Sequence, residues 1–366
     1  MLLILFGGMV LILVLWYVRG RDPHAGPVAK YFDHPPDDLP PGAAGTLLDE
    51  HVDDHDITAT LLGLARDGAV EITELPESDG RHDFVLTLVH PERIDSRLER
   101  DLLDVLFGAG AGRGAEVRLG QVRDRFEAYR DRIRDDLYRE MVNRGYFQRS
   151  PEEVRQRWRH ISIAGIVVSL VGGALLIAVT DWWALEPIIA SVIVWLVMLR
   201  VSRSMPQKTR HGAESAAKWR AFRDWLRDIR KFENLEENPG LFDRYFAYAV
   251  AFNLEDQWVK EFERAGAPAP RWYRRVDAGD VVIIPDLDGI PGGVGGLGEA
   301  GPLLGRVGEI DLPNVDLGGM PDVDIGGLGE GLQGASELMG SGLQGASDGL
   351  TDLLDSAGSI FDIFDW

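Results

Sequence analysis

Three long apolar runs constrain this chain most, because none of them has a charged residue or a histidine in its central part. They cover residues 1–18, 161–180 and 184–201. About 20 apolar residues in a helix reach across a lipid bilayer. The sequence therefore predicts a mainly α-helical membrane protein with three transmembrane helices.

The first run is predicted to be an anchor, and the other two a hairpin. Residues 1–18 lack the basic stretch and the small-residue cleavage site of a signal peptide, so we expect an uncleaved transmembrane anchor. Residues 161–201 form the hairpin, whose turn at Asp181 carries two tryptophans typical of a membrane interface. Ion-coupled transporters usually need ionisable residues at mid-membrane, so this pattern argues against transport.

Basic residues around the runs predict the orientation. Arg19 and Arg21 follow the anchor, and the hairpin is flanked by Arg155, Arg157, Arg159, Arg203, Lys208 and Arg210. Because basic flanks favour the cytoplasmic side, we expect a multi-pass plasma-membrane protein with its N-terminus and the Asp181 turn outside. Residues 19–160 and 202–366 are then cytoplasmic.

Small residues recur every four positions on the second run, at Gly165, Ser169 and Gly173. Such a face lets another helix approach closely. Two partners are open. One is the other helix of the hairpin, and the second is the same face of another copy, which would give a homodimer.

Residues 19–45 are predicted to be a proline-rich juxtamembrane linker, and residues 46–160 a cytosolic α+β domain of winged-helix-like character. A helix starting at Asp56 is expected to stop at Gly68 before a strand, and the same order returns at Gly145. Residues 19–160 hold 29 acidic and 21 basic residues. A membrane-tethered winged-helix DNA-binding regulator is therefore only an alternative, and no nucleic-acid partner is expected.

The richest group of ionisable side chains lies just before this helix. His51 and His55 are four residues apart among five acidic residues, and they would share one face of a helix. They are the candidate ligands of a divalent metal, and a membrane-bound metal-dependent hydrolase is the enzymatic alternative. Helix capping by the aspartates is the preferred interpretation, so neither a metal nor another cofactor is expected.

Residues 202–276 are predicted to form a cytosolic helical domain. An amphipathic helix over 217–232 places Trp219, Phe222 and Leu226 on one face, which packs in a core or lies on the membrane. Residues 277–366 hold 17 acidic residues, one basic residue and 22 glycines, and we expect a disordered Gly/Asp-rich tail.

Four stretches carry a resemblance to a known family. They are Pro-Pro-Asp-Asp-Leu-Pro-Pro at 35–41, the stretch from Asp56 to Gly68, the run from Lys208 through Trp219 to Leu226, and Tyr248 to Phe252. Together they resemble domain-of-unknown-function family 2207, the YciQ-like predicted membrane proteins. The resemblance implies the architecture described above and no known activity. It also implies an extracytoplasmic domain before the first span, so the sequence resembles a shortened form without that domain.

These features predict an uncharacterised integral membrane protein that acts as a non-enzymatic, membrane-anchored scaffold or regulator. Its expected partners are the lipid bilayer and a protein bound by the acidic tail or the cytosolic domains. The hydrolase and the DNA-binding regulator remain the alternatives.

Overall fold

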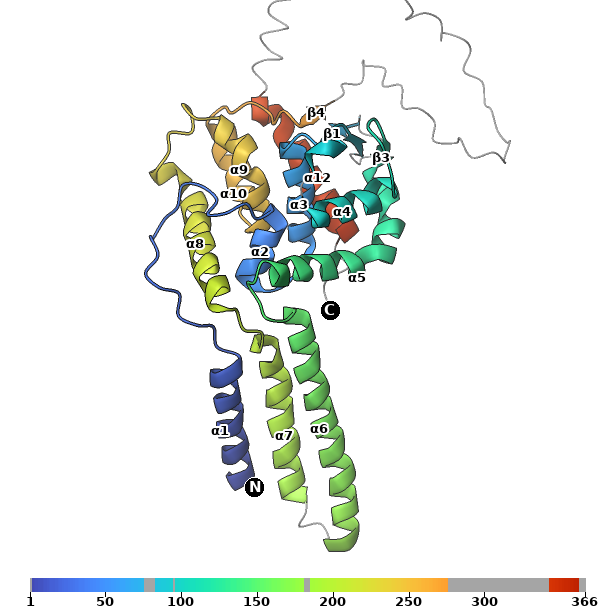
Figure 1. Cartoon of the computed structure of the whole chain (residues 1–366), viewed down its shortest axis with the longest axis vertical. Helices are drawn as coiled ribbons and strands as arrows, with labels where there is room; N and C mark the ends of the chain where they lie inside the picture. Colours follow the sequence, from blue (N-terminus) through green and yellow to red (C-terminus); the bar gives the residue numbers. More distant parts are fainter. Residues whose placement is uncertain (1, 76–82, 95, 181–184, 276–341, 362–366) are drawn as a thin grey trace, which may run out of the picture. The chain divides into compact units, whose positions relative to one another are not determined.

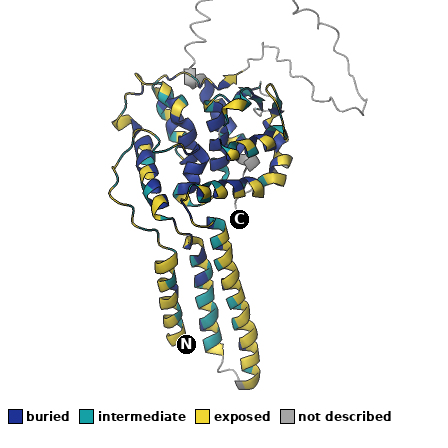
Figure 2. Cartoon of the chain, in the orientation of Figure 1, coloured by how far each residue is buried: buried dark blue, intermediate teal, exposed yellow. Residues whose placement is uncertain are grey.

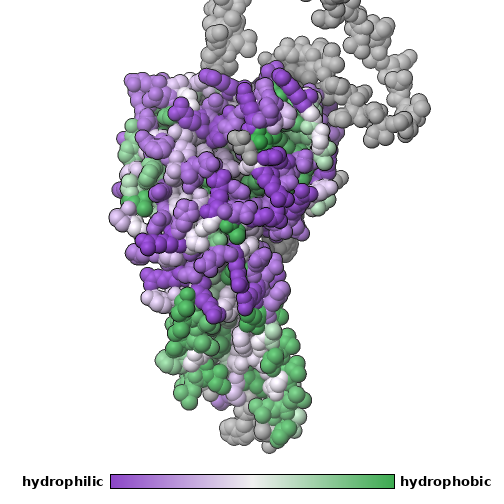
Figure 3. All heavy atoms as spheres, in the orientation of Figure 1, coloured by the Kyte–Doolittle hydropathy of each residue, from purple (hydrophilic) through white to green (hydrophobic). Residues whose placement is uncertain are grey.

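The computed structural model describes residues 2–75, 83–94, 96–180, 185–275 and 342–361. Three of its helices are long and apolar enough to cross a membrane, namely α1 (Leu2–Arg19), α6 (Pro151–Thr180) and α7 (Leu185–Val201). Their apolar side chains are mostly exposed (Figure 2), and Figure 3 shows them gathered over these helices. Exposed apolar surface of this extent marks a site of contact with lipid or with other apolar surfaces. The three predicted spans are confirmed as helices that are long and apolar enough to cross a membrane.

The small-residue face of α6 packs against α7. A Cβ added at Gly165 would lie 2.2 Å from the Trp195 ring, and one added at Gly173 would lie 2.6 Å from Ile188. Between these two contacts the hydroxyl oxygens of Ser169 and Ser191 are 2.8 Å apart. Hairpin packing is thus confirmed, and a homodimer contact through this face would have to displace α7.

The globular domain contains eight α-helices and a small sheet among the described residues. The helices are α2 (Pro41–Asp49), α3 (Asp54–Arg66), α4 (Arg97–Phe107), α5 (Leu119–Asn143), α8 (Arg210–Arg227), α9 (Gly240–Ala251), α10 (Glu255–Arg264) and α12 (Gly342–Phe361). The strands are β1 (Val70–Glu74), β2 (Phe84–Leu88), β3 (Glu116–Arg118) and β4 (Tyr273–Arg275). Figure 1 shows this domain at one end of the membrane helices, and the start of α1 at their other end.

The sheet joins parts of the chain that are far apart in sequence. Its strand order is β3-β2-β1-β4. β1 pairs antiparallel with β2, whereas β4 pairs parallel with β1, so that Ile72 lies opposite Tyr273. A parallel pair needs a long connection, and here the connection includes the transmembrane hairpin. The winged-helix-like character of residues 46–160 stays a prediction.

One hydrophobic core serves both of the regions that the sequence treats separately. α3 is its central helix, with every residue from Asp56 to Ala65 buried and with α9 packed along it. Trp219, Phe222 and Leu226 of α8 are buried in the same core. This confirms core packing for the α8 face over the membrane-surface alternative.

Gly68 and Gly145 end two helices in the same way, as the sequence predicts. Their φ angles are +74° and +75°, a left-handed conformation that glycine adopts without strain. In both, the next residue donates its N–H to a carbonyl five residues back, Ala69 to Leu64 and Tyr146 to Met141. β1 follows Gly68, but only an isolated bridge at Phe147 follows Gly145, so the second copy of the pattern is incomplete.

The proline-rich segment is part of the domain at its C-terminal end. Leu39 is fully buried, and α2 starts at Pro41, where proline fits the first turn because no intrahelical N–H is needed there. The predicted linker over 19–45 therefore overlaps a helix of the core.

The prediction of a disordered tail is wrong for its last helix. α12 contacts α3, α5 and α10, and buries Ala346, Leu350, Leu353 and Ala357. These residues lie on one helical face, but the glycine, serine and aspartate between them give the segment a low-complexity composition. The remaining tail residues, 277–341 and 362–366, lie outside the described residues.

Candidate functional site

The two histidines predicted as metal ligands do not share a helical face. His51 precedes α3, and its Nδ1 is 2.9 Å from the carbonyl oxygen of Asp49. His55 lies in the first turn of α3, with Nδ1 3.8 Å from the Asp54 carboxylate. The residues whose potential ligand atoms lie within 4.8 Å of one another are Asp53, Asp54 and His55. A metal site here stays an untested alternative.

Helix capping, the preferred interpretation of this acidic cluster, is confirmed. The carboxylate of Asp53 accepts a hydrogen bond of 3.1 Å from the backbone N–H of Asp56, and the Asp56 side chain faces the Asp53 N–H in return. This reciprocal capping box satisfies donors that the first turn of a helix leaves unpaired.

Asp56 is the most buried carboxyl of the cluster, at 1% exposure. Burial, followed by the nearby charges of Asp53 and Asp49, holds its pKa well above the ordinary value of 3.8. Thr46 gives an independent reason for a protonated Asp56. Its hydroxyl oxygen lies 3.1 Å from the Gly42 carbonyl and 2.8 Å from Asp56 Oδ2. One hydroxyl hydrogen cannot serve both contacts, whereas a protonated Asp56 donates to Thr46 and frees that hydrogen for Gly42.

Asp56→Asn is expected to stabilise the domain increasingly as pH rises. Since the folded-state pKa of Asp56 is raised, the stability from its proton is complete below about pH 4, the unfolded value, and is lost as pH rises through the folded value. Asparagine stays neutral throughout. Thermal unfolding at pH 4.5, 6 and 8 measures the difference. Asp131→Asn, at a carboxylate that is 81% exposed, is the control, and a difference that is equal at all three pH values would contradict a raised pKa.

Two buried cations converge on Glu50, directly where the domain meets the membrane helices. Glu50 ends α2 in a left-handed conformation, with φ +71°, and donates its N–H to the Thr46 carbonyl at 2.9 Å. Its side chain accepts a hydrogen bond from Lys208, and its carbonyl accepts one of 2.9 Å from Arg155. We call Glu50, Arg155 and Lys208 the membrane-proximal joint.

Lys208 brings the segment after α7 into this joint. Its side chain is 2% exposed, lies 3.6 Å from the Asp22 carboxylate, and has its ammonium 5.4 Å from the centre of the Phe147 ring. Its backbone N–H donates to the same Asp22 at 2.8 Å. A single lysine therefore links the segment after α1, the end of α2 and the start of α8.

Arg155 brings α6 into the joint. Besides Glu50, it donates a 2.6 Å hydrogen bond to the hydroxyl oxygen of Tyr138 on α5 and pairs with Glu152 at 3.0 Å. Burial raises the pKa of the Tyr138 hydroxyl, so this oxygen stays a neutral acceptor. Arg155 is thus a buried structural cation, although the sequence places it among the basic flanks of the hairpin.

Asp37 accepts hydrogen bonds from four donors. Its carboxylate accepts hydrogen bonds from the Tyr146 hydroxyl at 3.0 Å, the Ser215 hydroxyl at 3.1 Å and the Trp219 indole N–H at 3.2 Å. The backbone N–H of Leu39 is the fourth donor, at 3.2 Å. Asp37 therefore fastens the proline-rich segment to α8 and to the turn after α5.

Thr209 and Gly212 also hold the start of α8 against the turn after α5. Thr209 caps α8 by accepting from the Gly212 N–H at 2.9 Å, and its hydroxyl donates to the Gly145 carbonyl at 2.6 Å. A Cβ on Gly212 would lie 2.1 Å from the Tyr146 carbonyl oxygen, so only glycine fits. Thr209 and Gly212 both belong to the stretch from Lys208 to Leu226 that carries the family resemblance.

A cleft of about 530 Å³ lies beside Asp38 and the ends of α3 and α5. Its arginines have partners. Arg66 pairs with Asp67 through two hydrogen bonds of 2.8 and 2.9 Å, and Arg144 pairs with Asp38 at 2.7 Å. Arg93 donates to the Asp67 carbonyl, and Arg97 lies 3.5 Å from Asp101. The cleft is a structural charge network.

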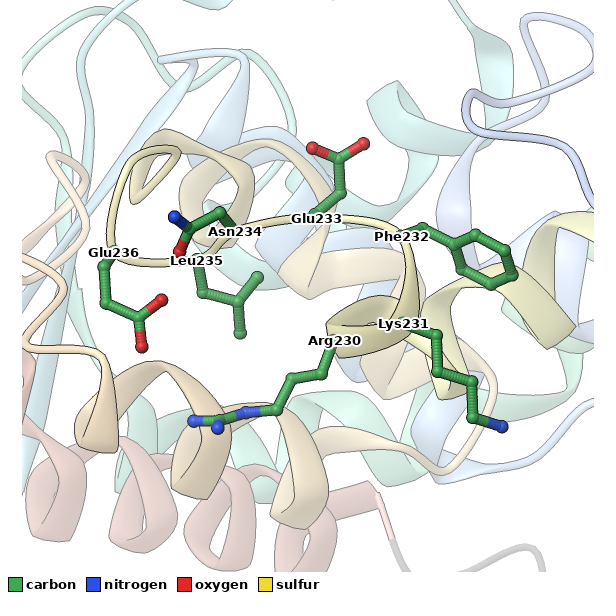
Figure 4. Close-up of a pocket in the computed structure, with 7 residues that line it drawn as sticks. All are labelled: Arg230, Lys231, Phe232, Glu233, Asn234, Leu235 and Glu236. Atoms are coloured by element: carbon green, nitrogen blue, oxygen red, sulfur yellow. The ribbon is translucent and has the colours of Figure 1, made fainter.

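A smaller hollow of about 380 Å³ is formed by consecutive residues 230–236 (Figure 4). Leu235 is buried beneath it, and Arg230 and Lys231 pair with Glu261 and Asp228. The hollow is the surface of one turn.

The joint and Asp37 lie inside a region that matches a family model. The model is described as predicted membrane protein (DUF2207) C-terminal domain, and it matches residues 28–262. This chain belongs to the DUF2207 family. Among curated proteins and solved structures, nothing matches it. The DUF2207 match includes both hairpin helices and ends before β4 and α12.

Sequence reasoning missed the residues whose hydrogen bonds and ion pairs hold distant segments of this DUF2207 protein together. The sequence pattern places Glu50 in the acidic cluster, and Arg155 and Lys208 in the basic flanks of the hairpin. Asp37 lies within the quoted stretch 35–41, where the sequence indicates no role for it. One signal in the sequence could have pointed to them. In each quoted stretch, a polar residue lies close to glycine, proline or tryptophan, and such a combination indicates a structural role for the polar side chain.

Proposed function

We propose that this DUF2207 protein is a membrane-anchored, non-enzymatic scaffold or regulator that acts through protein contacts of its globular domain. The observation that carries the proposal is the membrane-proximal joint, where two buried cations converge on Glu50. Burying charges costs desolvation free energy, and its best-attested use is to fix one geometry. A joint of this kind suits a protein that presents a surface to partners at a set place on the membrane.

The same joint also suits signal transmission. Glu50 ends α2, and its partners lie at the start of α6 and just before α8. A partner that moves α2 would therefore break contacts with the membrane hairpin as well. Through this connection the protein could pass a signal between the globular domain and the membrane hairpin, which a passive anchor could not do.

We place the globular domain in the cytoplasm and the protein in the plasma membrane. Support comes from arginines that are exposed where the helices meet the domain, namely Arg19, Arg21, Arg157, Arg159 and Arg203. Such residues favour the cytoplasmic side.

Cysteine labelling tests this orientation cleanly because the chain has no cysteine of its own. In intact cells, a membrane-impermeant maleimide should label Leu3→Cys near the start of α1. It should label Arg220→Cys, on the exposed side of α8, only after permeabilisation. The reverse pattern would overturn the placement.

Photocrosslinking in native membranes tests the function itself. A crosslinking residue at position 220 of the full chain should capture a reproducible set of proteins. The control is a tagged anchor made of residues 1–21 alone, expressed at the same level. A captured set no different from that of the anchor would overturn the scaffold or regulator proposal.

A further inference from the structure

The globular domain already binds one amphipathic helix, which is its own α12. This helix lies against α3, α5 and α10 (Figure 1). Ala346, Leu350, Leu353 and Ala357 face the domain at spacings of four, three and four residues, while Asp348 and Asp355 are exposed. That spacing is one stripe of a helix. We call the surface under it the α12 groove.

The α12 groove contains a point of close contact that selects glycine. A Cβ on Gly349 would lie 2.0 Å from the Tyr273 hydroxyl oxygen and 2.3 Å from Glu74 Oε2. Tyr273 donates a hydrogen bond to Glu74, so these two buried groups of β4 and β1 hold each other in place. Any helix that occupies the groove must therefore carry glycine at this position.

The contact of α12 has no aromatic side chain among the residues whose burial the structure describes. Within residues 346–357 the buried apolar side chains are two leucines and two alanines, whereas α10 buries Trp258 and Phe262, and α3 is buried along ten consecutive residues, Asp56–Ala65. In sequence, residues 277–341 separate α12 from β4, so α12 is not held by a short connection. Elements with few buried contacts open at lower free energy than the core does.

We propose that the α12 groove is the protein-docking surface of the domain and that α12 occupies it until a partner helix displaces it. The partner is an amphipathic helix with leucines one turn apart and a glycine immediately before the first of them, as in Gly349, Leu350 and Leu353. The inference deepens the proposed function and rests on it, because it names where a protein partner binds and what that partner presents.

A peptide-binding experiment on the full chain tests the groove. The probe is a fluorescent peptide of residues 342–361. Gly349→Leu in the chain should release its own α12, and the peptide should then bind at least about tenfold more tightly than it binds the wild-type chain, where a tethered competitor fills the groove. Asp355→Leu, which adds the same side chain on the exposed face, is the matched control and should bind like wild type. A peptide that itself carries Gly349→Leu should not bind.

Hydrogen exchange of the wild-type chain gives a second readout that needs no variant to fold. The amides of α12 should exchange faster than those of α3 and α9. Equal protection of α12 and α3 would overturn the proposal, as would a folded Gly349→Leu chain that does not bind the peptide. Dimers that exchange α12 between copies would overturn the choice of a separate partner. If the groove fails these tests while position 220 still captures partners, the scaffold proposal stands without it.

Discussion

Lys208→Met is expected to lower the free energy of unfolding of the domain by about 3 kcal/mol. Methionine keeps much of the packing of the lysine chain but leaves Glu50 without its buried cation, and Asp22 loses the same partner. For a domain of this size, the loss corresponds to roughly 6–12 °C in the unfolding midpoint. Tryptophan fluorescence during heating in detergent micelles measures it, because Trp219 and Trp258 are both fully buried.

Two further variants separate the lost ion pair from a general effect of lysine removal. Lys218→Met, on the exposed side of α8, should unfold within about 0.5 kcal/mol of the wild type. Glu50→Gln added to Lys208→Met should recover part of the loss, since the partly buried side chain at position 50 then carries no charge that lacks a partner. Unfolding of Lys208→Met at the wild-type temperature would show that the joint carries no stability.

Asp37→Ala is expected to cost about 3–5 kcal/mol, because it leaves several buried donors without an acceptor. The hydroxyls of Tyr146 and Ser215 and the indole N–H of Trp219 all point to this carboxylate, and each of these residues is at most 5% exposed. Equilibrium unfolding in urea should show the loss as a lower midpoint with an unchanged slope.

The neighbouring aspartate supplies the control. The carboxylate of Asp38 is 89% exposed, and the guanidinium of Arg144 lowers its pKa. An exposed pair of this kind contributes about 0–1 kcal/mol, so Asp38→Ala should be nearly neutral. Asp37→Asn keeps one oxygen acceptor and should fall between the two. Equal effects of Asp37→Ala and Asp38→Ala would refute the role assigned to Asp37.

The helices of this fold were predictable where residues close in sequence determine their ends and their packing faces. Gly68 and Gly145 stop their helices by adopting positive φ, and Ser96 caps α4 with a reciprocal bond from Glu99. The small residues of α6 indicated close packing, and the hairpin offered the nearest helix. Each of these features depends on residues within a few turns, which sequence periodicity reports directly.

The contacts between distant segments were not predictable in the same way. β4 has only three residues, so no alternation marks it as a strand, and its partner β1 lies far upstream. Asp37 sits among prolines and aspartates that have the composition of a solvated linker, and nothing local indicates the donors from α8. Glu50 adopts a left-handed backbone conformation that favours glycine. Because the residue is a glutamate within an acidic cluster, nothing local marks position 50 as the end of a helix.

The parallel pairing of β1 with β4 has a consequence for biosynthesis. The chain between them is about 200 residues long, which takes roughly 10–40 s to translate at 5–20 residues per second. During that time the edge of β1 is unpaired, and the hairpin must enter the bilayer. If only one hairpin helix crosses, β4 emerges on the opposite side and cannot reach β1. Closure of the sheet thus reports correct membrane insertion, and a misinserted chain keeps an exposed strand edge that marks it for chaperones and proteases.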